Sequence, residues 1–168
     1  MQDDPQTQAS TELVEKMGLE FEADGGPRIA GRIVGYLLLS PQPRSLDRMA
    51  HDLLISKTSA SANARLLERR GALERVSRPG DRRDFYRISP NLHLRILARS
   101  VDRMRAMSEL IGKARASFTG QAAEVQERLR TFDQFFEYML DVVSEARRHW
   151  ESEHERSGAG SAAARATG

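Results

Sequence analysis

Apolar residues recur at intervals of three and four over most of the chain, which is the spacing of amphipathic helices. In the first quarter this spacing predicts a helix that begins at Thr11 and stops at the Asp24-Gly25-Gly26 breaker. A second helix is predicted from Pro27 to the Ser40-Pro41-Gln42-Pro43 segment, since proline suits a first helical turn. We expect the residues before Thr11 to form a polar, disordered leader.

Two shorter helices and a hairpin are predicted between residues 44 and 89. Ser45 is placed to cap a helix Ser45–Leu53, and Ser56 a second helix that ends at Arg70-Gly71. The buried stripe of that second helix consists of Ala60, Ala64 and Leu67. Strands Leu73–Ser77 and Phe85–Ile88 then enclose a turn, Pro79-Gly80-Asp81-Arg82-Arg83. This order of elements is typical of a winged helix-turn-helix.

The face opposite the alanine stripe indicates a DNA-reading helix. Its residues are Thr58, Ser59, Ala62 and Arg65, with Lys57 and Ser61 at the margins. These side chains are mostly short and able to hydrogen-bond, whereas a solvated helix face would be rich in Glu and Lys. We expect Thr58, Ser61 and Arg65 to read bases, while Arg44, Ser45 or Arg48 contact phosphates.

Arginines are concentrated at the predicted hairpin turn. Arg78, Arg82 and Arg83 suit a narrow minor groove, where the potential is most negative. Asp81 would be repelled by phosphate, so we expect it to brace Arg83 or Arg82 through a bidentate pair. The residues alone leave open which arginine enters the groove.

The C-terminal part predicts two long helices, the first beginning at Ser89-Pro90 and ending at Phe118-Thr119-Gly120. The second carries an apolar seam in steps of four and three over more than three heptads. The seam residues assigned to dimerisation are Val125, Leu129, Phe132, Phe136, Met139, Val143 and Trp150. A helix of about 30 residues spans roughly 45 Å and cannot bury such a seam on one small domain. Homodimerisation is the favoured interpretation, and packing on helix 90–116 alone is the alternative.

The predicted fold is mainly α (α+β), a winged helix-turn-helix with a two-stranded wing flanked by long N- and C-terminal dimerisation helices. The predicted parts are a disordered leader (1–10), an N-terminal helix contributing to dimerisation (11–26), the DNA-binding domain (27–89), a helical dimerisation arm (90–152) and a disordered tail (153–168).

The distribution of charge supports DNA as the partner. The formal net charge is only +2, but residues 44–87 hold 11 Arg and Lys against six Asp and Glu. Residues 1–43 hold three against seven, and residues 88–168 hold 12 against 11. A local basic patch attracts phosphate whatever the net charge of the molecule.

Several other classes of function have little support. The absence of cysteine excludes disulfides and thiolate metal sites. His149 and His154, five residues apart, do not share a helix face, so a solvated helix end explains them better than a metal site. No phosphate loop, nucleophile-histidine pair or apolar-embedded carboxylate pair suggests an enzyme. We expect no cofactor, no membrane span and a cytoplasmic location.

Gly31 and Gly35, four residues apart, predict a close contact between the second helix and a neighbouring helix.

Three blocks of sequence resemble the MarR superfamily of bacterial regulators, and most closely its GbsR-type branch. They are Gly26–Gly35, Ser56–Ser61 and the wing Pro79–Tyr86, within a likeness that covers about residues 12–150. The resemblance implies a homodimeric transcription factor whose DNA binding a small ligand can modulate. It also implies that Ser56, Lys57, Thr58, Ser61 and Arg65 face the major groove, and that Arg83, braced by Asp81, enters the minor groove. The stretch from Asp81 to Ser89 is one residue shorter than the commonest wing of the family. The resemblance therefore does not decide which wing arginine enters the minor groove.

These observations predict a sequence-specific transcriptional regulator that binds a pseudo-palindromic operator in double-stranded DNA. A repressor is favoured over an activator. The alternatives are a winged helix that serves as a protein-interaction module and a non-specific architectural DNA binder. The effector is not identified. An aromatic cage for a quaternary ammonium could be built from Phe118, Phe132, Phe135, Phe136, Tyr138 and Trp150, but core packing explains the seam aromatics more simply.

Overall fold

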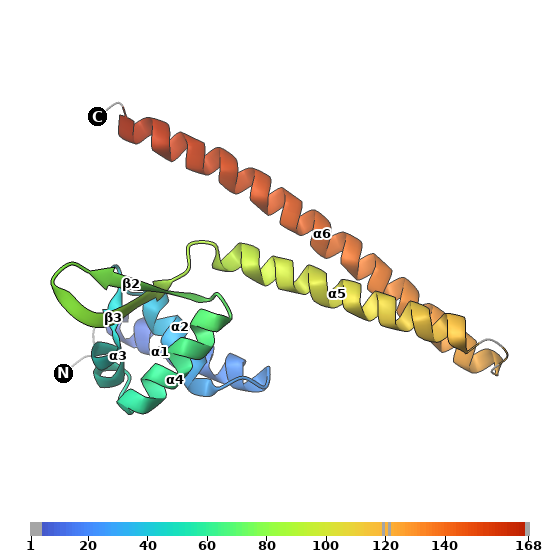
Figure 1. Ribbon diagram of the computed structural model, residues 1–168, viewed down its shortest axis with the longest axis horizontal. Coiled ribbons are helices and arrows are strands. Elements are labelled where there is room, and N and C mark those ends of the chain that lie inside the picture. The colour runs from blue at the N-terminus through green and yellow to red at the C-terminus, as the bar shows by residue number, and fades with distance from the viewer. Residues whose placement is uncertain (1–4, 119, 121, 167–168) are drawn as a thin grey trace. The chain divides into compact units, whose positions relative to one another are not determined.

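The computed structural model describes residues 5–118, 120 and 122–166, and the side chains among them up to residue 154 except that of Pro5. The elements are α1 (Pro5–Ala23), α2 (Arg28–Leu38), β1 (Arg44–Ser45), α3 (Leu46–Asp52), α4 (Lys57–Arg69), β2 (Leu73–Arg78), β3 (Asp81–Ile88), α5 (Leu92–Ser117) and α6 (Ala123–Ala166) (Figure 1). They form two compact units, and the division falls between Leu92 and His93.

Helices α1 and α2 pack closely because α2 presents glycine to its neighbour. A Cβ atom on Gly31 would collide with the carbonyl oxygen of Met17, and one on Gly35 would lie 3.0 Å from the Cα of Val14. The predicted close helix contact is therefore confirmed. Helix α1 begins at Pro5 rather than at Thr11, so the part of the predicted leader that the structure describes is helical, and residues 1–4 lie outside the described residues.

The core of the first unit lies where α2, α3 and α4 meet the sheet. Its largest fully buried side chains are those of Tyr86, Ile33, Met49 and Leu67. The predicted stripe on α4 is confirmed, because Ala60 and Ala64 are fully shielded from solvent and Leu67 is shielded almost completely. Short side chains at these positions let α4 sit close to the core while its opposite face stays in solvent.

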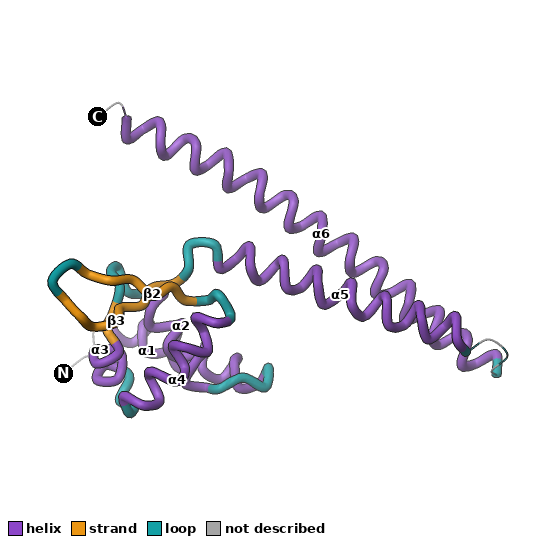
Figure 2. The backbone as a smooth tube through the Cα atoms, in the orientation of Figure 1, coloured by secondary structure: helices purple, strands orange, loops and turns teal. Residues whose placement is uncertain are grey.

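The sheet has three antiparallel strands in the order β1-β3-β2 rather than the two predicted. Strand β1 pairs Arg44 with Tyr86 and Ser45 with Phe85. Two residues are too few to show an alternating pattern, so the sequence carried no signal for this strand. Strands β2 and β3 form a hairpin (Figure 2) with its turn at Pro79-Gly80, and their pairing is irregular between Val76 and Arg78.

The second unit is a helical hairpin in which α5 and α6 converge at the short connection between them (Figure 1). Near that connection Arg115 of α5 forms an ion pair of 2.6 Å with Asp133 of α6, which is only 4% exposed. Helix α6 continues to Ala166, so residues 153–166 are helical where a disordered tail was predicted, and residues 167–168 lie outside the described residues. No helix among the described residues is both long and apolar enough to span a membrane.

Candidate nucleic-acid interface

Two serines fix where the helices of the helix-turn-helix begin. The side-chain oxygen of Ser45 accepts a hydrogen bond from the backbone N–H of Arg48, at 3.3 Å. That of Ser56 accepts one from the backbone N–H of Ser59, at 3.1 Å. Both contacts satisfy an N–H that the helix itself leaves unpaired, so both predicted caps are confirmed.

The outward face of α4 contains the predicted base-reading residues, but they differ in how freely they can act. Thr58, Ala62 and Arg65 are exposed, whereas Ser59 and Ser61 are half-buried. The Ser56 hydroxyl also donates to the Ser59 hydroxyl at 3.0 Å. Ser56 and Ser59 are therefore engaged in capping the helix. The side chains on the exposed face that stay available for DNA are mainly those of Thr58 and Arg65.

Lys57 is held by an acidic residue of the preceding helix. Its Nζ lies 2.7 Å from a carboxylate oxygen of Asp47, and both side chains are exposed. An exposed pair of this kind contributes little to stability, so DNA phosphate can compete for the lysine. Among the described residues, the side chains of Arg65 and Arg82 form no hydrogen bond or ion pair.

The wing arginine Arg83 is braced by Asp81, as the sequence predicted for one of the two arginines. The Nε of Arg83 lies 3.0 Å from both carboxylate oxygens of Asp81, and its Nη2 lies 2.5 Å from Oδ2. The backbone N–H of Arg83 donates to the same carboxylate. Hydrogen bonds from the Arg83 side chain and backbone lower the pKa of Asp81 to about 2, so the carboxylate is ionised at neutral pH.

Arg78 is the last residue of β2 and pairs with Asp81 across the hairpin turn. Its guanidinium folds back over the ring of Phe85, 4.3 Å from the ring centroid, and donates to the carbonyl oxygen of Pro43 at 3.2 Å. A weaker contact of 3.4 Å joins it to Gln42. The prediction missed this because the contact joins residues 35 positions apart.

A basic pocket of about 400 Å³ lies beside the base of the wing. Arg44, Arg48 and Arg78 line it from three different elements, together with Ser45, Phe85 and residues 41–43. No Asp or Glu is among its lining residues. The arrangement suits a phosphate group. It brings together Arg44 and Arg48, which were predicted to contact phosphates, and Arg78, which was predicted to act in the wing.

Arg48 is oriented by a hydrogen-bonded network that no pattern in the sequence indicates. Its Nε donates to Asp52 at 2.7 Å, and the Tyr36 hydroxyl donates to the same oxygen at 2.6 Å. Burial acts to raise the pKa of Asp52, but hydrogen bonds from Tyr36, His51 and Arg48 outweigh it and lower that pKa to about 2. Burial and the bond to Asp52 raise the pKa of Tyr36.

The predicted dimerisation seam divides into two groups. Five of its residues, Val125, Leu129, Phe136, Met139 and Val143, are half-buried in the single chain. They lie on the face of α6 that carries Asp133, the partner of Arg115 on α5. Phe132 and Trp150 are exposed. Intrachain packing, the alternative interpretation, therefore accounts for part of the seam.

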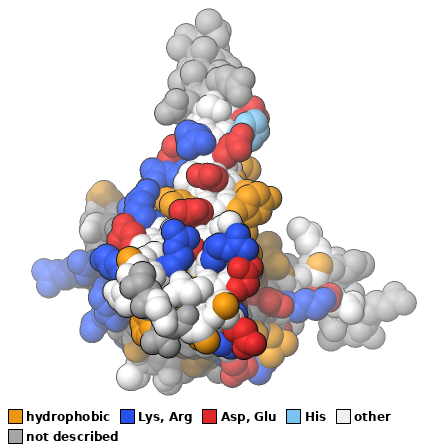
Figure 3. All heavy atoms as spheres, turned by 90° about the vertical axis from the view of Figure 1, so that its right-hand side faces the viewer, with side chains coloured by type: hydrophobic (Ala, Val, Ile, Leu, Met, Phe, Trp, Pro, Cys, Tyr) orange, Lys and Arg blue, Asp and Glu red, His pale blue; other side chains and the backbone are white. Residues whose placement is uncertain are grey.

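A second apolar row on α6 faces solvent; it shares Phe132 with the predicted seam, and its other residues lie about a third of a turn from the seam. This outer row consists of Phe132, Phe135, Tyr138 and Val142. Figure 3 shows apolar side chains at the surface of the helical column between acidic and basic ones. Trp150 stacks on His154 with 4.2 Å between ring centroids and makes an edge contact with His93. Its ring is therefore already in contact with two other side chains, which does not favour its use in an aromatic cage for a quaternary ammonium. Among the described residues, no three His, Asp or Glu side chains gather as metal ligands.

Comparison with known proteins identifies the family. The chain is 38% identical over 139 residues to the HTH-type transcriptional regulator MmpR5 of Mycobacterium tuberculosis, a MarR family member, and the match covers 80% of this chain and 82% of that protein. The chain belongs to the MarR superfamily. A second relative, YvaV of Bacillus subtilis, is 27% identical over 96 residues, or 55% of this chain and 54% of that protein.

A solved structure shares the fold of this chain. The crystal structure of a transcriptional regulator matches with a TM-score of 0.68 and 32% identity, over 86% of this chain and 99% of that one. No family model matches the chain. In this winged helix, α4 is the second helix of the helix-turn-helix and the β2–β3 hairpin is the wing. The relatives are transcriptional regulators and not enzymes.

Proposed function

We propose that the protein is a homodimeric, sequence-specific transcriptional repressor that acts in the cytoplasm on a pseudo-palindromic operator. Each subunit places α4 in a major groove and its wing at the adjacent minor groove. The observation that carries the proposal is the outward face of α4, where Thr58 and Arg65 stand exposed beside the wing on which Asp81 already orients Arg83. Pre-ordering of Arg83 reduces the entropy lost when it enters a groove.

Phosphate contacts set the register of the recognition helix in this proposal. The basic pocket receives a backbone phosphate between Arg44, Arg48 and Arg78, with Ser45 beside them. Lys57 exchanges Asp47 for a second phosphate. These contacts carry affinity and salt dependence, whereas Thr58, Ser61 and Arg65 carry sequence preference.

The outer row of α6 is the proposed contact with a second copy of the chain. Tyr138 is 65% exposed and Phe132 and Phe135 are each more than half exposed, which is unfavourable on an isolated chain. Burial of these rings against a symmetry-related helix would contribute stability in proportion to the apolar area removed from water. The N-terminal helix α1 contributes to the same assembly. Assignment to the GbsR-type branch stays a prediction from the three motif blocks.

Selection of random duplexes by the purified protein, at near-physiological salt, tests the proposal. Enrichment of an inverted repeat with half-sites about one helical turn apart supports dimeric, specific recognition. Binding that falls steeply with salt but enriches no motif would instead favour a non-specific architectural binder. That second candidate is supported by the engagement of Ser56 and Ser59 in capping, which leaves few side chains free to read bases. Absence of any DNA binding would contradict both and favour a protein-interaction module.

A further inference from the structure

The turn between α3 and α4 contains an apolar side chain that the fold does not use. Leu53, Leu54 and Ile55 follow α3 in succession, and the first is buried while the last packs against the core. Leu54, between them, is 91% exposed, more than any other large hydrophobic side chain that the structure describes. A single exposed leucine is ordinary on a protein surface, so exposure alone assigns it no role.

The backbone conformation at Leu54 is also unfavourable for leucine. Its φ angle is 53°, the one left-handed value among the non-glycine residues that the structure describes. The backbone N–H of Leu54 donates to the His51 carbonyl oxygen at 3.2 Å, and that of Ile55 donates to the Ala50 carbonyl oxygen at 3.0 Å. This pair of hydrogen bonds closes a helix through one left-handed residue, for which glycine is the usual choice and asparagine the next.

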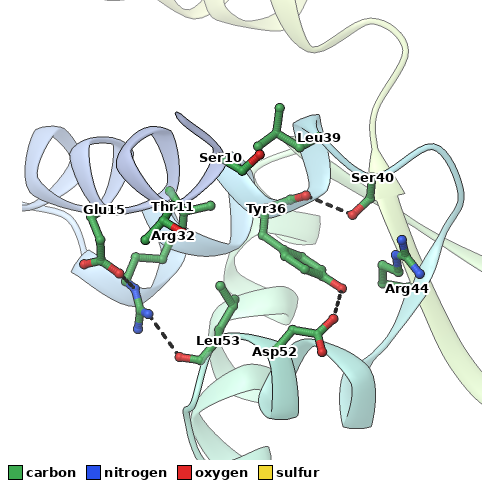
Figure 4. Close-up of a pocket in the computed structure, with 11 residues that line it drawn as sticks. Ser10, Thr11, Glu15, Arg32, Tyr36, Leu39, Ser40, Arg44, Asp52 and Leu53 are labelled. Atoms are coloured by element: carbon green, nitrogen blue, oxygen red, sulfur yellow. Dashed lines mark hydrogen bonds and ion pairs between the residues drawn. The ribbon is translucent and has the colours of Figure 1, made fainter. Parts of the chain in front are cut away.

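Contacts from α1 and α2 hold this turn in place. The Nη2 of Arg32 donates to the Leu53 carbonyl oxygen at 3.0 Å, and its Nε donates to Glu15 of α1 at 2.8 Å (Figure 4). A strained backbone conformation persists where the surrounding structure over-determines it, and such positions cluster at binding sites. Leucine gains no burial at position 54 in return for its strain, which favours a role for its side chain in binding.

Leu54 lies next to the end of α4 that approaches DNA in a helix-turn-helix. Ser56, two residues later, caps that helix, and the N-terminal residues of such a helix contact base edges. The carboxylate of Asp52, two residues before Leu54, already accepts hydrogen bonds from Arg48 and Tyr36. Its negative charge is therefore compensated by Arg48 and opposes the approach of DNA to this turn only weakly.

We infer that Leu54 is a specificity-determining residue of the DNA interface, whose side chain contacts the C5 methyl group of a thymine in the major groove. The thymine methyl is the apolar feature among the base edges of that groove, and apolar side chains recognise it. The fixed backbone of the turn reduces the entropy lost when Leu54 makes this contact. The inference rests on the proposed function, because it assigns one base contact within the same interface.

Substitution at Leu54 separates DNA binding from folding and assembly. Leu54→Asn removes the apolar surface but suits the left-handed conformation, so it should melt at the native temperature or above it. It should also sediment as the native protein does. A lower melting temperature would assign the Leu54 side chain to folding, and a change in sedimentation would assign it to a contact between subunits. Either result would overturn the inference.

The DNA measurement is an anisotropy titration with the operator duplex that the native protein selects from random sequences. Each thymine is replaced in turn by deoxyuridine, which lacks the C5 methyl group. One such replacement in each half-site should weaken native binding about fourfold, the effect of one methyl group removed from an apolar contact. The same replacement should not affect Leu54→Asn, because the methyl group has already lost its partner there.

Two further variants control for the change of side chain. Leu54→Met restores an apolar side chain at the turn and should respond to deoxyuridine as the native protein does. Leu110→Asn removes a leucine that is 58% exposed on α5, and it should also keep the native response. Loss of the response in Leu54→Met, or in Leu110→Asn, would overturn the assignment to an apolar contact at the turn.

The outcomes distinguish this inference from the proposed function. If the native protein selects an operator, but its loss at every deoxyuridine persists unchanged in Leu54→Asn, the thymine contact is overturned and specific binding stands. Proportional loss by Leu54→Asn on operator and random duplexes alike would also overturn it, because a lost base contact acts on the operator. A native protein that selects no operator would contradict the proposed function, and the inference would fall with it.

Discussion

The guanidinium of Arg83 is held by both carboxylate oxygens of Asp81, two residues earlier on strand β3. An acidic residue thus stands at the tip of a wing that is proposed to meet the most negative part of DNA. Its negative charge opposes binding, whereas its geometry favours binding by holding Arg83 in one conformation. The two effects have opposite signs, so they can be separated by substitution.

We predict that Asp81→Ala weakens DNA binding severalfold although it makes the wing more positive, because Arg83 loses its brace. Asp84→Ala is the matched control, since Asp84 lies on the same strand and its carboxylate pairs with Arg75, at 3.4 Å, and with no other cation among the described residues. That change should leave affinity unchanged or raise it slightly. Anisotropy titrations at several salt concentrations measure both, and tighter binding by Asp81→Ala would show that charge outweighs geometry.

Arg65→Ala should cost about 1–3 kcal/mol of binding free energy on the selected operator and relax preference at one position. The reason is that Arg65 is the long donor on the exposed face of α4. Arg105→Ala, which removes the same charge from α5, is the control. The duplex selection repeated with each variant provides the measurement. Equal loss on every sequence would remove Arg65 from base reading and assign it to phosphate.

The exposed outer row of α6 predicts separate effects on assembly and on folding. Tyr138→Glu should shift the protein from dimer to monomer, since Tyr138 is largely exposed, while the melting of the helices changes little. Met139→Glu, one residue further on and half-buried, should lower the stability of the arm itself. Sedimentation velocity and circular dichroism distinguish the two results. A dimer that tolerates Tyr138→Glu would place the interface elsewhere.

Two helix glycines should respond in opposite directions to alanine. Gly31→Ala forces a methyl group into the backbone of α1 and should destabilise by about 2–3 kcal/mol or prevent folding. Gly112→Ala meets only Asp133 Oδ1 at an ordinary 3.7 Å and should stabilise by about 0.5–1 kcal/mol through lower chain entropy. Urea unfolding of the two variants decides the matter. Similar values for both would argue against close contact of α1 and α2.

Acid should weaken the first unit through Asp52. Its pKa in the folded protein is about 2, below the ordinary 3.8, so its network contributes stability above pH 3.8 and loses it as the pH falls toward 2. The contribution is at most about 2 kcal/mol. Unfolding free energies measured from pH 6 to pH 2 should therefore fall less steeply in Asp52→Asn than in the native protein. Parallel curves would show that the network contributes nothing.

Much of the fold could be predicted because its signals are local. Ser45 and Ser56 act as caps within three residues of their partners, and the stripe of Ala60, Ala64 and Leu67 follows the helical repeat. The brace of Arg83 by Asp81 was also within reach, since it spans two residues. Strand β1 was missed because its two residues gain their structure only by pairing with β3, some 40 residues later.

The chain by itself therefore determined the starts of α3 and α4, the hairpin that follows them, the buried face of α4 and the basic character of residues 44–87, since each depends on neighbours a few positions away. Only the tertiary structure decided which groups share a space. It placed the guanidinium of Arg78 over the ring of Phe85, joined Arg48 to Tyr36 through Asp52, and left the Nε of Arg44 shielded from solvent without an acceptor. The physical reason is that packing of the core fixes the distances between distant segments, and periodicity along the chain contains no measure of those distances.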